Sequence, residues 1–389
     1  MKLISNETIR QIHATLSSRQ GEIEKFTQEL VELESPSGDE SGSRAVVAKL
    51  VAAAEGLTCI KAIEKVNVDR FGQHLLVRAF HDEKATQLLV VGHTDTVHAK
   101  GSVQRRPWRR EEGKIYGPGI FDMKANCALV LEVFRTLQEL KIQPQVGVAL
   151  LLTCDEEVGS TSGWPFIERA ARSGETSFAM VLEPPATGGR VKTGRKGTGI
   201  FTLKVEGKAA HAGLEPEKGA SAILELARQT ERIHSINKAG AGITVNVGVI
   251  RGGTRSNVVP AEAEAEIDVR FSNEREAAEI EQFLFNLKPI DERTRVFVSG
   301  GINRPPLERT PEVISLFEKA RSIAKVMDFD LGEAQVGGAS DGNFLAALGI
   351  PVLDGLGLNG DGAHADHEHI LAADIPVRGT LIAGLIASA

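Results

Sequence analysis

Runs of consecutive apolar residues recur along the first half of the chain and end in polar loops. Three of them cover residues 88–91, 146–152 and 178–182. Such runs are typical of central strands in a parallel sheet, because helices cover both faces of the sheet and no polar face is needed. Residues 9–33 and the segment after Asp122 have apolar positions at helical spacing instead. This alternation predicts an α/β domain.

A different pattern begins after about Gly188, where strands with alternating polarity and two amphipathic helices follow one another. The order is strand, helix, strand, strand, helix, strand, over residues 201–205, 220–236, 243–250, 263–271, 274–287 and 295–298. That order is the one of a ferredoxin-like α+β sandwich. From Thr310 onward, helices and strands alternate again. We therefore expect a discontinuous first domain, residues 1–192 and 305–389, interrupted by an inserted domain, residues 193–304.

Composition narrows the class of protein. The chain has 389 residues, which favours two domains. Its 45 Lys and Arg against 52 Asp and Glu give a net charge of -7, which disfavours nucleic acid and anionic membranes as partners. The three cysteines suggest no disulfide framework, and neither a signal peptide nor a membrane-spanning apolar run stands out. We expect a cytoplasmic protein.

Acidic residues and histidines gather where the apolar runs end. His93 and Asp95 follow the first run, Glu156 and Glu157 the second, and Glu183 the third. The carboxyl ends of such strands meet at one edge of a sheet, where ligands bind. Charged groups seldom accumulate there unless they are paired or bound to a metal, because neighbouring carboxylates repel one another. These positions predict a metal-dependent active site.

Two loops add further candidates, and the number of groups suggests two metal ions. Asp122 can bridge the two ions, with His93 and Glu183 at one and Glu157 and His364 at the other. Mixed histidine and carboxylate ligation with an open position is what catalytic zinc uses, and a pair of metals activates water for attack. The adjacent Glu156 is then available as a general base. The chemistry predicted is hydrolysis of an amide.

Six motifs support a more specific reading. They are GHTDTV from Gly92, GPGIFDMKA from Gly117, CDEEVGS from Cys154, LEP from Leu182, KAAHAG ending at Gly213 and AHADHE from Ala363. In this order and spacing they resemble the M20 family of dinuclear zinc peptidases, and in particular its glutamate carboxypeptidase branch. The resemblance implies a zinc-peptidase-like α/β/α catalytic domain, with an inserted ferredoxin-like domain that serves for dimerisation and as a lid.

The same resemblance assigns roles to residues. It implies two zinc ions, with cobalt or manganese as substitutes, held by His93, Asp122, Glu157, Glu183 and His364. Asp95 would orient His93, Glu156 would act as the base, and the Asp122–Met123 peptide bond would be cis. In the inserted domain, His211 would stabilise the oxyanion across a homodimer. Asn257 and Arg304, with Arg270 as a weaker candidate, would bind the carboxylate of the substrate.

The sequence leaves several alternatives open. We expect release of a C-terminal amino acid, with glutamate as a candidate, from a peptide or an N-acyl amino acid. A biosynthetic deacylase of the acetylornithine or succinyl-diaminopimelate type is the alternative, and a catalytically silent carboxylate-binding protein is a third. His367 and His369 compete with His364 for the metal. His98 is expected to have no role.

Overall fold

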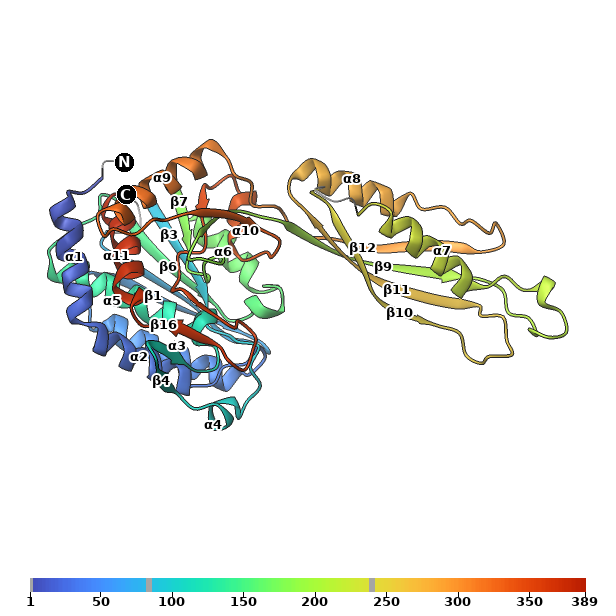
Figure 1. The fold of residues 1–389 in the computed structure, drawn as a ribbon, viewed down its shortest axis with the longest axis horizontal. Coiled ribbons are helices and arrows are strands. Elements are labelled where there is room, and N and C mark those ends of the chain that lie inside the picture. Colours follow the sequence, from blue (N-terminus) through green and yellow to red (C-terminus); the bar gives the residue numbers. More distant parts are fainter. Residues whose placement is uncertain (1–2, 82–85, 238–241) are drawn as a thin grey trace. The chain divides into compact units, whose positions relative to one another are not determined.

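The computed structural model describes residues 3–81, 86–237 and 242–389 and divides into two compact units (Figure 1). The first unit comprises Met1–Gly194, Arg309–Val336 and Ser340–Ala389. The second comprises Arg195–Glu308 and Gly337–Ala339. The second unit is thus an insertion into the chain of the first.

A six-stranded mixed sheet forms the centre of the first unit. Its strands run in the order β1 (Ile60–Val68), β2 (Gly72–Ala79), β6 (Gly147–Thr153), β3 (Gln87–His93), β7 (Thr176–Val181) and β14 (Val352–Leu353). The last four strands pair in parallel, whereas β1 and β2 are antiparallel. Every residue of β3 and β6 is buried, which confirms the prediction of central strands.

Helices surround this sheet (Figure 1). They are α1 (Asn6–Ser18), α2 (Gln20–Glu32), α3 (Glu40–Glu55), α4 (Ser102–Arg105), α5 (Ala125–Glu139), α6 (Gly163–Arg172), α9 (Pro311–Lys325), α10 (Gly342–Ala347) and α11 (Asp374–Ala387). Helix α5 packs against α1, α2, α3 and α11, and α6 packs against α10. The resulting apolar core includes Leu88, Val90, Leu129 and Phe134. The fold is therefore α/β, as the apolar pattern predicts.

Two small sheets bring distant loops together in the first unit. One contains β15 (Gly360–Asp361), β16 (His369–Leu371), β5 (Lys114–Tyr116) and β4 (Arg109–Glu111). The other pairs β13 (Glu333–Val336) with β8 (Val191–Arg195). Because β16 pairs with β5, the loop that precedes β16 lies beside the loop that follows β5.

The second unit is an antiparallel four-stranded sheet with two helices on one face. The strands run in the order β10 (Thr244–Gly252), β11 (Glu262–Phe271), β9 (Gly197–Glu206) and β12 (Arg295–Arg304). Helices α7 (Ala222–His234) and α8 (Glu274–Phe285) cover the buried side chains, which alternate along β11. The chain order of these elements confirms the predicted ferredoxin-like arrangement.

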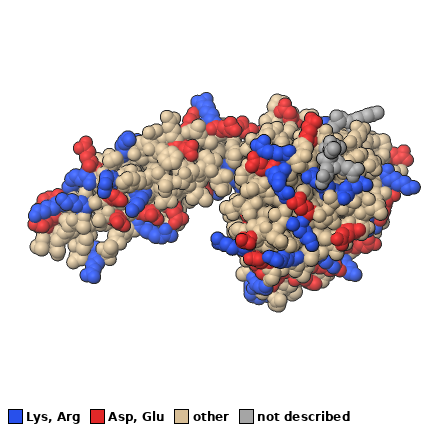
Figure 2. All heavy atoms as spheres, turned by 180° about the vertical axis from the view of Figure 1, so that it is seen from behind, with Lys and Arg blue, Asp and Glu red and all other residues tan. Residues whose placement is uncertain are grey.

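The charged side chains of both signs are interspersed on the face drawn in Figure 2. This distribution agrees with the small net charge of -7. Among the helices that the structure describes, none combines the length and the apolar character that a membrane span requires.

Candidate active site

Three neighbouring strands deliver acidic and imidazole side chains to one edge of the central sheet. β3 ends at His93, β6 ends just before Glu156 and Glu157, and β7 ends two residues before Glu183. β3 pairs in parallel with both β6 and β7, so the three carboxyl ends lie side by side. His93 is the last residue of its strand, and the glutamates lie just beyond theirs. The sequence predicts the catalytic groups at this edge of the sheet.

Asp122 lies between two histidines. Its Oδ1 is 3.0 Å from Nε2 of His93, and its Oδ2 is 3.5 Å from Nε2 of His364. The two oxygens of one carboxylate therefore face two different imidazoles. The Asp122–Met123 peptide bond is cis, which confirms that prediction. The role of Asp122 as a bridging ligand stays a prediction.

Two further carboxylates complete the cluster, one beside each histidine. Oε1 of Glu183 is 3.5 Å from Nε2 of His93, and Oε2 of Glu157 is 3.1 Å from Nε2 of His364. The five predicted ligands are thus brought together around Asp122. Glu156 also comes close, because one of its oxygens lies within 4.8 Å of ligand atoms of His93 and Glu183.

The donors of this cluster fit two divalent cations. Nδ1 of His93 is 2.9 Å from the backbone carbonyl oxygen of Asp95, which can only accept, so Nδ1 donates. The lone pair of Nε2 then faces carboxylate oxygens, an arrangement that needs a proton or a metal ion between the atoms. Oε1 of Glu157 is buried without a hydrogen-bond partner among the described residues. Imidazole nitrogens with carboxylate oxygens are the ligands that catalytic zinc prefers.

Hydrogen bonds, charges and burial within the cluster also shift the pKa values of its members. Burial opposes a charge on His93, but hydrogen bonds to Asp122 and Asp95 outweigh it and raise the pKa of His93 well above its ordinary value. The hydrogen bond to Asp122 raises the pKa of His364 to about 9. Burial, helped by the Asp122 carboxylate, raises the pKa of Glu157 to about 8. These raised pKa values all favour the protonated forms of groups that are predicted to bind metal.

Asp95 contacts the loop that carries the two adjacent glutamates. Its Oδ1 accepts a hydrogen bond from the amide of Glu156 and its Oδ2 one from the amide of Glu157, both at 3.2 Å. The hydroxyl of Ser37 donates to Oδ2 at 2.6 Å. Oδ1 lies 3.4 Å from Nδ1 of His93. The carboxylate of Asp95 therefore connects the loop after β6 to His93, and its role as an orienting group stays a prediction.

Among the described residues, His367 and His369 do not contact the predicted metal ligands around Asp122. His369 is 6% exposed, its Nδ1 lies 2.9 Å from the carbonyl oxygen of His367, and its ring packs on Tyr116. His367 is exposed. Of the three histidines, His364 is the one that lies within ion-pair distance of Asp122 in the contacts that the structure describes.

Two residues that the sequence analysis did not assign to the site are Glu368 and His98. Glu368 is 2% exposed and accepts hydrogen bonds from the amides of Gly119, Phe121 and Asp122. Nε2 of His98 contacts the same carboxylate, and the expectation that His98 has no role stays a prediction. Their partners are distant in the sequence. The one signal was an acidic residue inside the AHADHE motif.

The predicted substrate-binding residues all lie in the second unit. Nδ1 of His211 accepts hydrogen bonds from the amides of Gly213 and Leu214, and the ring is exposed. Asn257 is also exposed, and its carbonyl oxygen accepts from the amide of Ala212, so it neighbours His211.

The two arginines differ in their surroundings. Arg304 ends β12 and is 6% exposed. Arg270 donates through Nε and a terminal nitrogen to the two carboxylate oxygens of Asp268, each at 2.8 Å. Arg270 therefore already holds a carboxylate of its own strand, and the substrate-binding roles of both arginines stay predictions.

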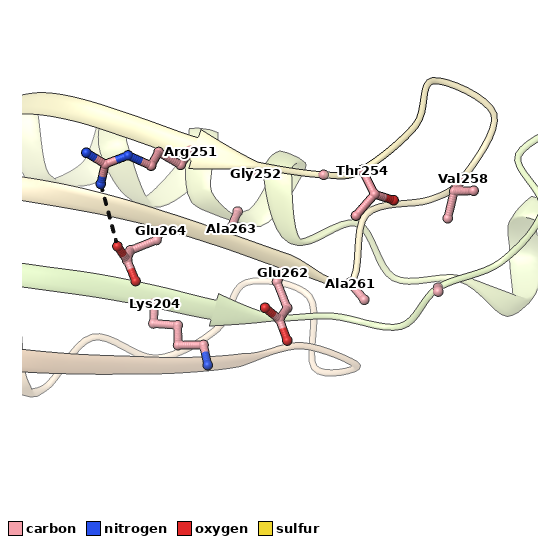
Figure 3. A pocket seen from close by; sticks show the side chains of 11 residues that line it. Lys204, Arg251, Gly252, Thr254, Val258, Ala261, Glu262, Ala263 and Glu264 are labelled. Atoms are coloured by element: carbon pink, nitrogen blue, oxygen red, sulfur yellow. Dashed lines mark ion pairs between the residues drawn. The ribbon is translucent and has the colours of Figure 1, made fainter.

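A separate pocket of about 630 Å³ opens on the second unit (Figure 3). Its charged lining residues are Lys204, Arg251, Glu262 and Glu264. Arg251 pairs with Glu264 at 3.9 Å and with Glu266 at 2.8 Å. The positive and negative charges of its lining offset one another, and its lining residues include none of the five predicted metal ligands.

Comparison with known proteins agrees with this geometry. The model of peptidase family M20/M25/M40 matches residues 89–388. Carboxypeptidase G2 of Pseudomonas sp. strain RS-16 is 30% identical over 375 residues, 93% of this chain and 88% of that protein. A succinyl-diaminopimelate desuccinylase of Acidovorax ebreus is 27% identical over 373 residues, 90% of this chain and 93% of that enzyme.

A solved structure shares the fold over nearly the whole length. It is a dinuclear metal-binding peptidase of the M20 family from Bacillus subtilis, with a TM-score of 0.70 and 13% identity, covering 95% of this chain and 98% of that one. The family match spans both the strand-end carboxylates and the His364 loop. The chain therefore belongs to peptidase family M20/M25/M40 and is a metallohydrolase of that family.

Proposed function

We propose that this protein uses two zinc ions to hydrolyse an amide bond and to release a C-terminal amino acid, with glutamate as the first candidate. The substrate is a peptide or an N-acyl amino acid with a free carboxylate. The observation that carries the proposal is the position of Asp122, whose two oxygens face His93 at 3.0 Å and His364 at 3.5 Å. One carboxylate placed in this way can serve two metal ions.

The ligands divide into two sets around this bridge. His93 and Glu183 would hold one ion, and Glu157 and His364 the other. Bound divalent ions supply Lewis acidity at the scissile carbonyl and lower the pKa of water. Cobalt or manganese would suit the same nitrogen and oxygen donors.

Glu156 carries the proton transfer. Its carboxylate takes a proton from the attacking water as the C–O bond forms, and it passes that proton to the amide nitrogen as the C–N bond breaks. Asp95 supports this role, because it accepts a hydrogen bond from the amide of Glu156 at 3.2 Å and so restrains the loop. His211 would stabilise the oxyanion. The substrate carboxylate would bind to Asn257 and Arg304, because an arginine fork matches a planar carboxylate.

The second unit offers a surface for a homodimer. Strand β10 lies at the edge of its sheet, so its outer backbone groups are open to pairing with another strand. Large apolar side chains on and beside it are exposed: Ile223 (43%), Leu224 (51%), Val249 (36%) and Ile250 (54%). An edge strand with exposed apolar neighbours favours association with a second copy.

A biosynthetic deacylase is the second candidate, because the desuccinylase of Acidovorax ebreus aligns with 90% of this chain. A panel of zinc-loaded assays separates the two. It would contain peptides and N-acyl compounds ending in glutamate, succinyl-diaminopimelate and acetylornithine. We expect the highest kcat/KM for the glutamate compounds. A preference for succinyl-diaminopimelate would replace the carboxypeptidase with the deacylase, and absence of hydrolysis throughout would favour a silent binding protein.

A further inference from the structure

Glu368 is a buried carboxylate that takes no part in the proposed chemistry, yet it holds the loop that carries Asp122. Its side chain is 1% exposed. Oε1 accepts hydrogen bonds from the amides of Phe121 at 2.8 Å and Asp122 at 3.0 Å, and Oε2 accepts one from the amide of Gly119 at 2.7 Å. Three backbone donors on one carboxylate fix the course of that backbone, because each bond is charge-assisted.

A second contact fixes the carboxylate itself. Nε2 of His98 contacts Oε2 of Glu368, and Nδ1 of His98 is 3.2 Å from a terminal nitrogen of Arg106. A guanidinium group can only donate, so Nδ1 accepts and Nε2 carries the hydrogen that is donated to Glu368. Arg106 also donates to the carbonyl oxygen of Ala365 at 3.3 Å. Arginine, histidine and glutamate thus form one connected chain.

This chain joins three segments that carry predicted ligands. His98 follows His93 by five residues, and Glu368 follows His364 by four. The amides that Glu368 binds include that of Asp122. The spacing of His93, Asp122 and His364 is therefore constrained from outside the metal cluster as well as within it.

We propose that Glu368 is a positioning residue for the metal centre, and that His98 and Arg106 hold Glu368 in place. This inference rests on the proposed function, because it takes Asp122 and His364 as metal ligands. Residues of this kind commonly change metal affinity or activity by about 10-fold to 100-fold when they are replaced. Without Glu368, the backbone from Gly119 to Asp122 loses three hydrogen bonds, and the Asp122 carboxylate is no longer held between the two histidines.

The test measures zinc affinity by chelator competition, with kcat and KM as a second readout. Glu368→Gln keeps the volume of the side chain but sets an amide nitrogen against backbone donors. We expect about 10-fold to 100-fold weaker zinc binding at one or both sites. With zinc in excess, kcat falls and KM changes little, since no contact with substrate is removed.

Glu225→Gln is the matched control. Glu225 is 1% exposed in the second unit and accepts hydrogen bonds from the amides of Ile290 at 2.8 Å and Asp291 at 2.9 Å. The same chemical change there lowers the melting temperature but leaves zinc affinity at the wild-type value. A purely structural role for Glu368 would make the two variants behave alike, which would overturn the proposal.

A pair of variants at His98 tests the chain without changing Glu368. The side chain of His98→Gln retains an N–H donor for Glu368, whereas that of His98→Ala does not. We expect zinc affinity to fall in the alanine variant and to be largely restored in the glutamine variant. Equal affinities in both variants and the wild type would contradict the role of His98. Wild-type protein that binds fewer than two zinc ions would instead refute the metal centre itself.

Discussion

Glu156 and Glu157 are adjacent in the chain but differ in what they face. Oε2 of Glu157 is 3.1 Å from His364, and its other oxygen is buried without a partner among the described residues. Glu156 lies near His93 and Glu183, within 4.8 Å of their ligand atoms. Distances alone allow Glu156 to be a base or a ligand, and replacing each glutamate separates these roles.

Glu156→Gln should retain both metal ions and lose turnover. The amide has nearly the shape of the carboxylate but cannot accept the proton from water, so we expect kcat to fall by about 10²-fold to 10⁴-fold. Steady-state kinetics with elemental analysis of the same sample checks this. Glu157→Gln is the comparison, and it should lose metal as well as activity. Near-normal kcat in Glu156→Gln would refute the assignment of the base, and loss of metal would make Glu156 a ligand.

At the scale of residues, the sequence indicates the predicted ligands but not the contacts between distant segments that hold them in place. His93, Glu157 and Glu183 meet because three parallel strands end side by side. His98 and Glu368 are 270 positions apart, and nothing in either local sequence indicates that they touch. A resemblance between motifs identifies ligands more readily than it identifies the groups that hold the ligands in place.

At the scale of elements, long apolar runs are predicted well and short strands are not. β3 and β6 have seven residues each, all buried, and they stand out by composition. β14 and β15 have two residues each, too few to show any period. Residues 9–33 divide into α1 and α2 at Arg19, whose φ of −96° and ψ of 2° depart from helical values. The apolar spacing continues across this break and conceals it.

The first turn of α3 gives a prediction about pH. Asp39 caps this helix by accepting from the amide of Gly42 at 3.2 Å, and it also accepts from the Lys100 ammonium at 2.8 Å. The hydrogen bond from Lys100 lowers the pKa of Asp39 from 3.8 to about 2. As the pH falls, the unfolded chain binds this proton first, so the stabilisation by Asp39 is lost between about pH 4 and pH 2.

Asp39→Asn should therefore lower the free energy of unfolding slightly near neutral pH. Asparagine still caps a helix, so the loss reflects the charge on Asp39. The difference from wild type should shrink as the pH falls through that window. Urea denaturation at several pH values measures it. A difference that stays constant down to about pH 2 would show that the ionised carboxylate adds nothing to stability.

At the scale of the whole molecule, the proposed homodimer depends on the edge strand β10. Ile250→Asp should give a monomer, because it places a charge on an apolar surface that the dimer would bury. Ile200→Asp is the control, since Ile200 is 60% exposed but lies on the inner strand β9. Light scattering after gel filtration distinguishes the masses. A wild-type monomer, or equal masses for both variants, would contradict a dimer through β10.

The zinc content per chain shows whether the protein holds a two-metal centre bridged by Asp122. The wild-type protein is reconstituted with zinc, freed of unbound metal and measured by elemental analysis together with its protein concentration. We expect two zinc ions per chain, and a marked loss from both sites in Asp122→Ala, because that carboxylate faces both His93 and His364. One ion or fewer in the wild type, or two ions retained in Asp122→Ala, would contradict a centre bridged by Asp122.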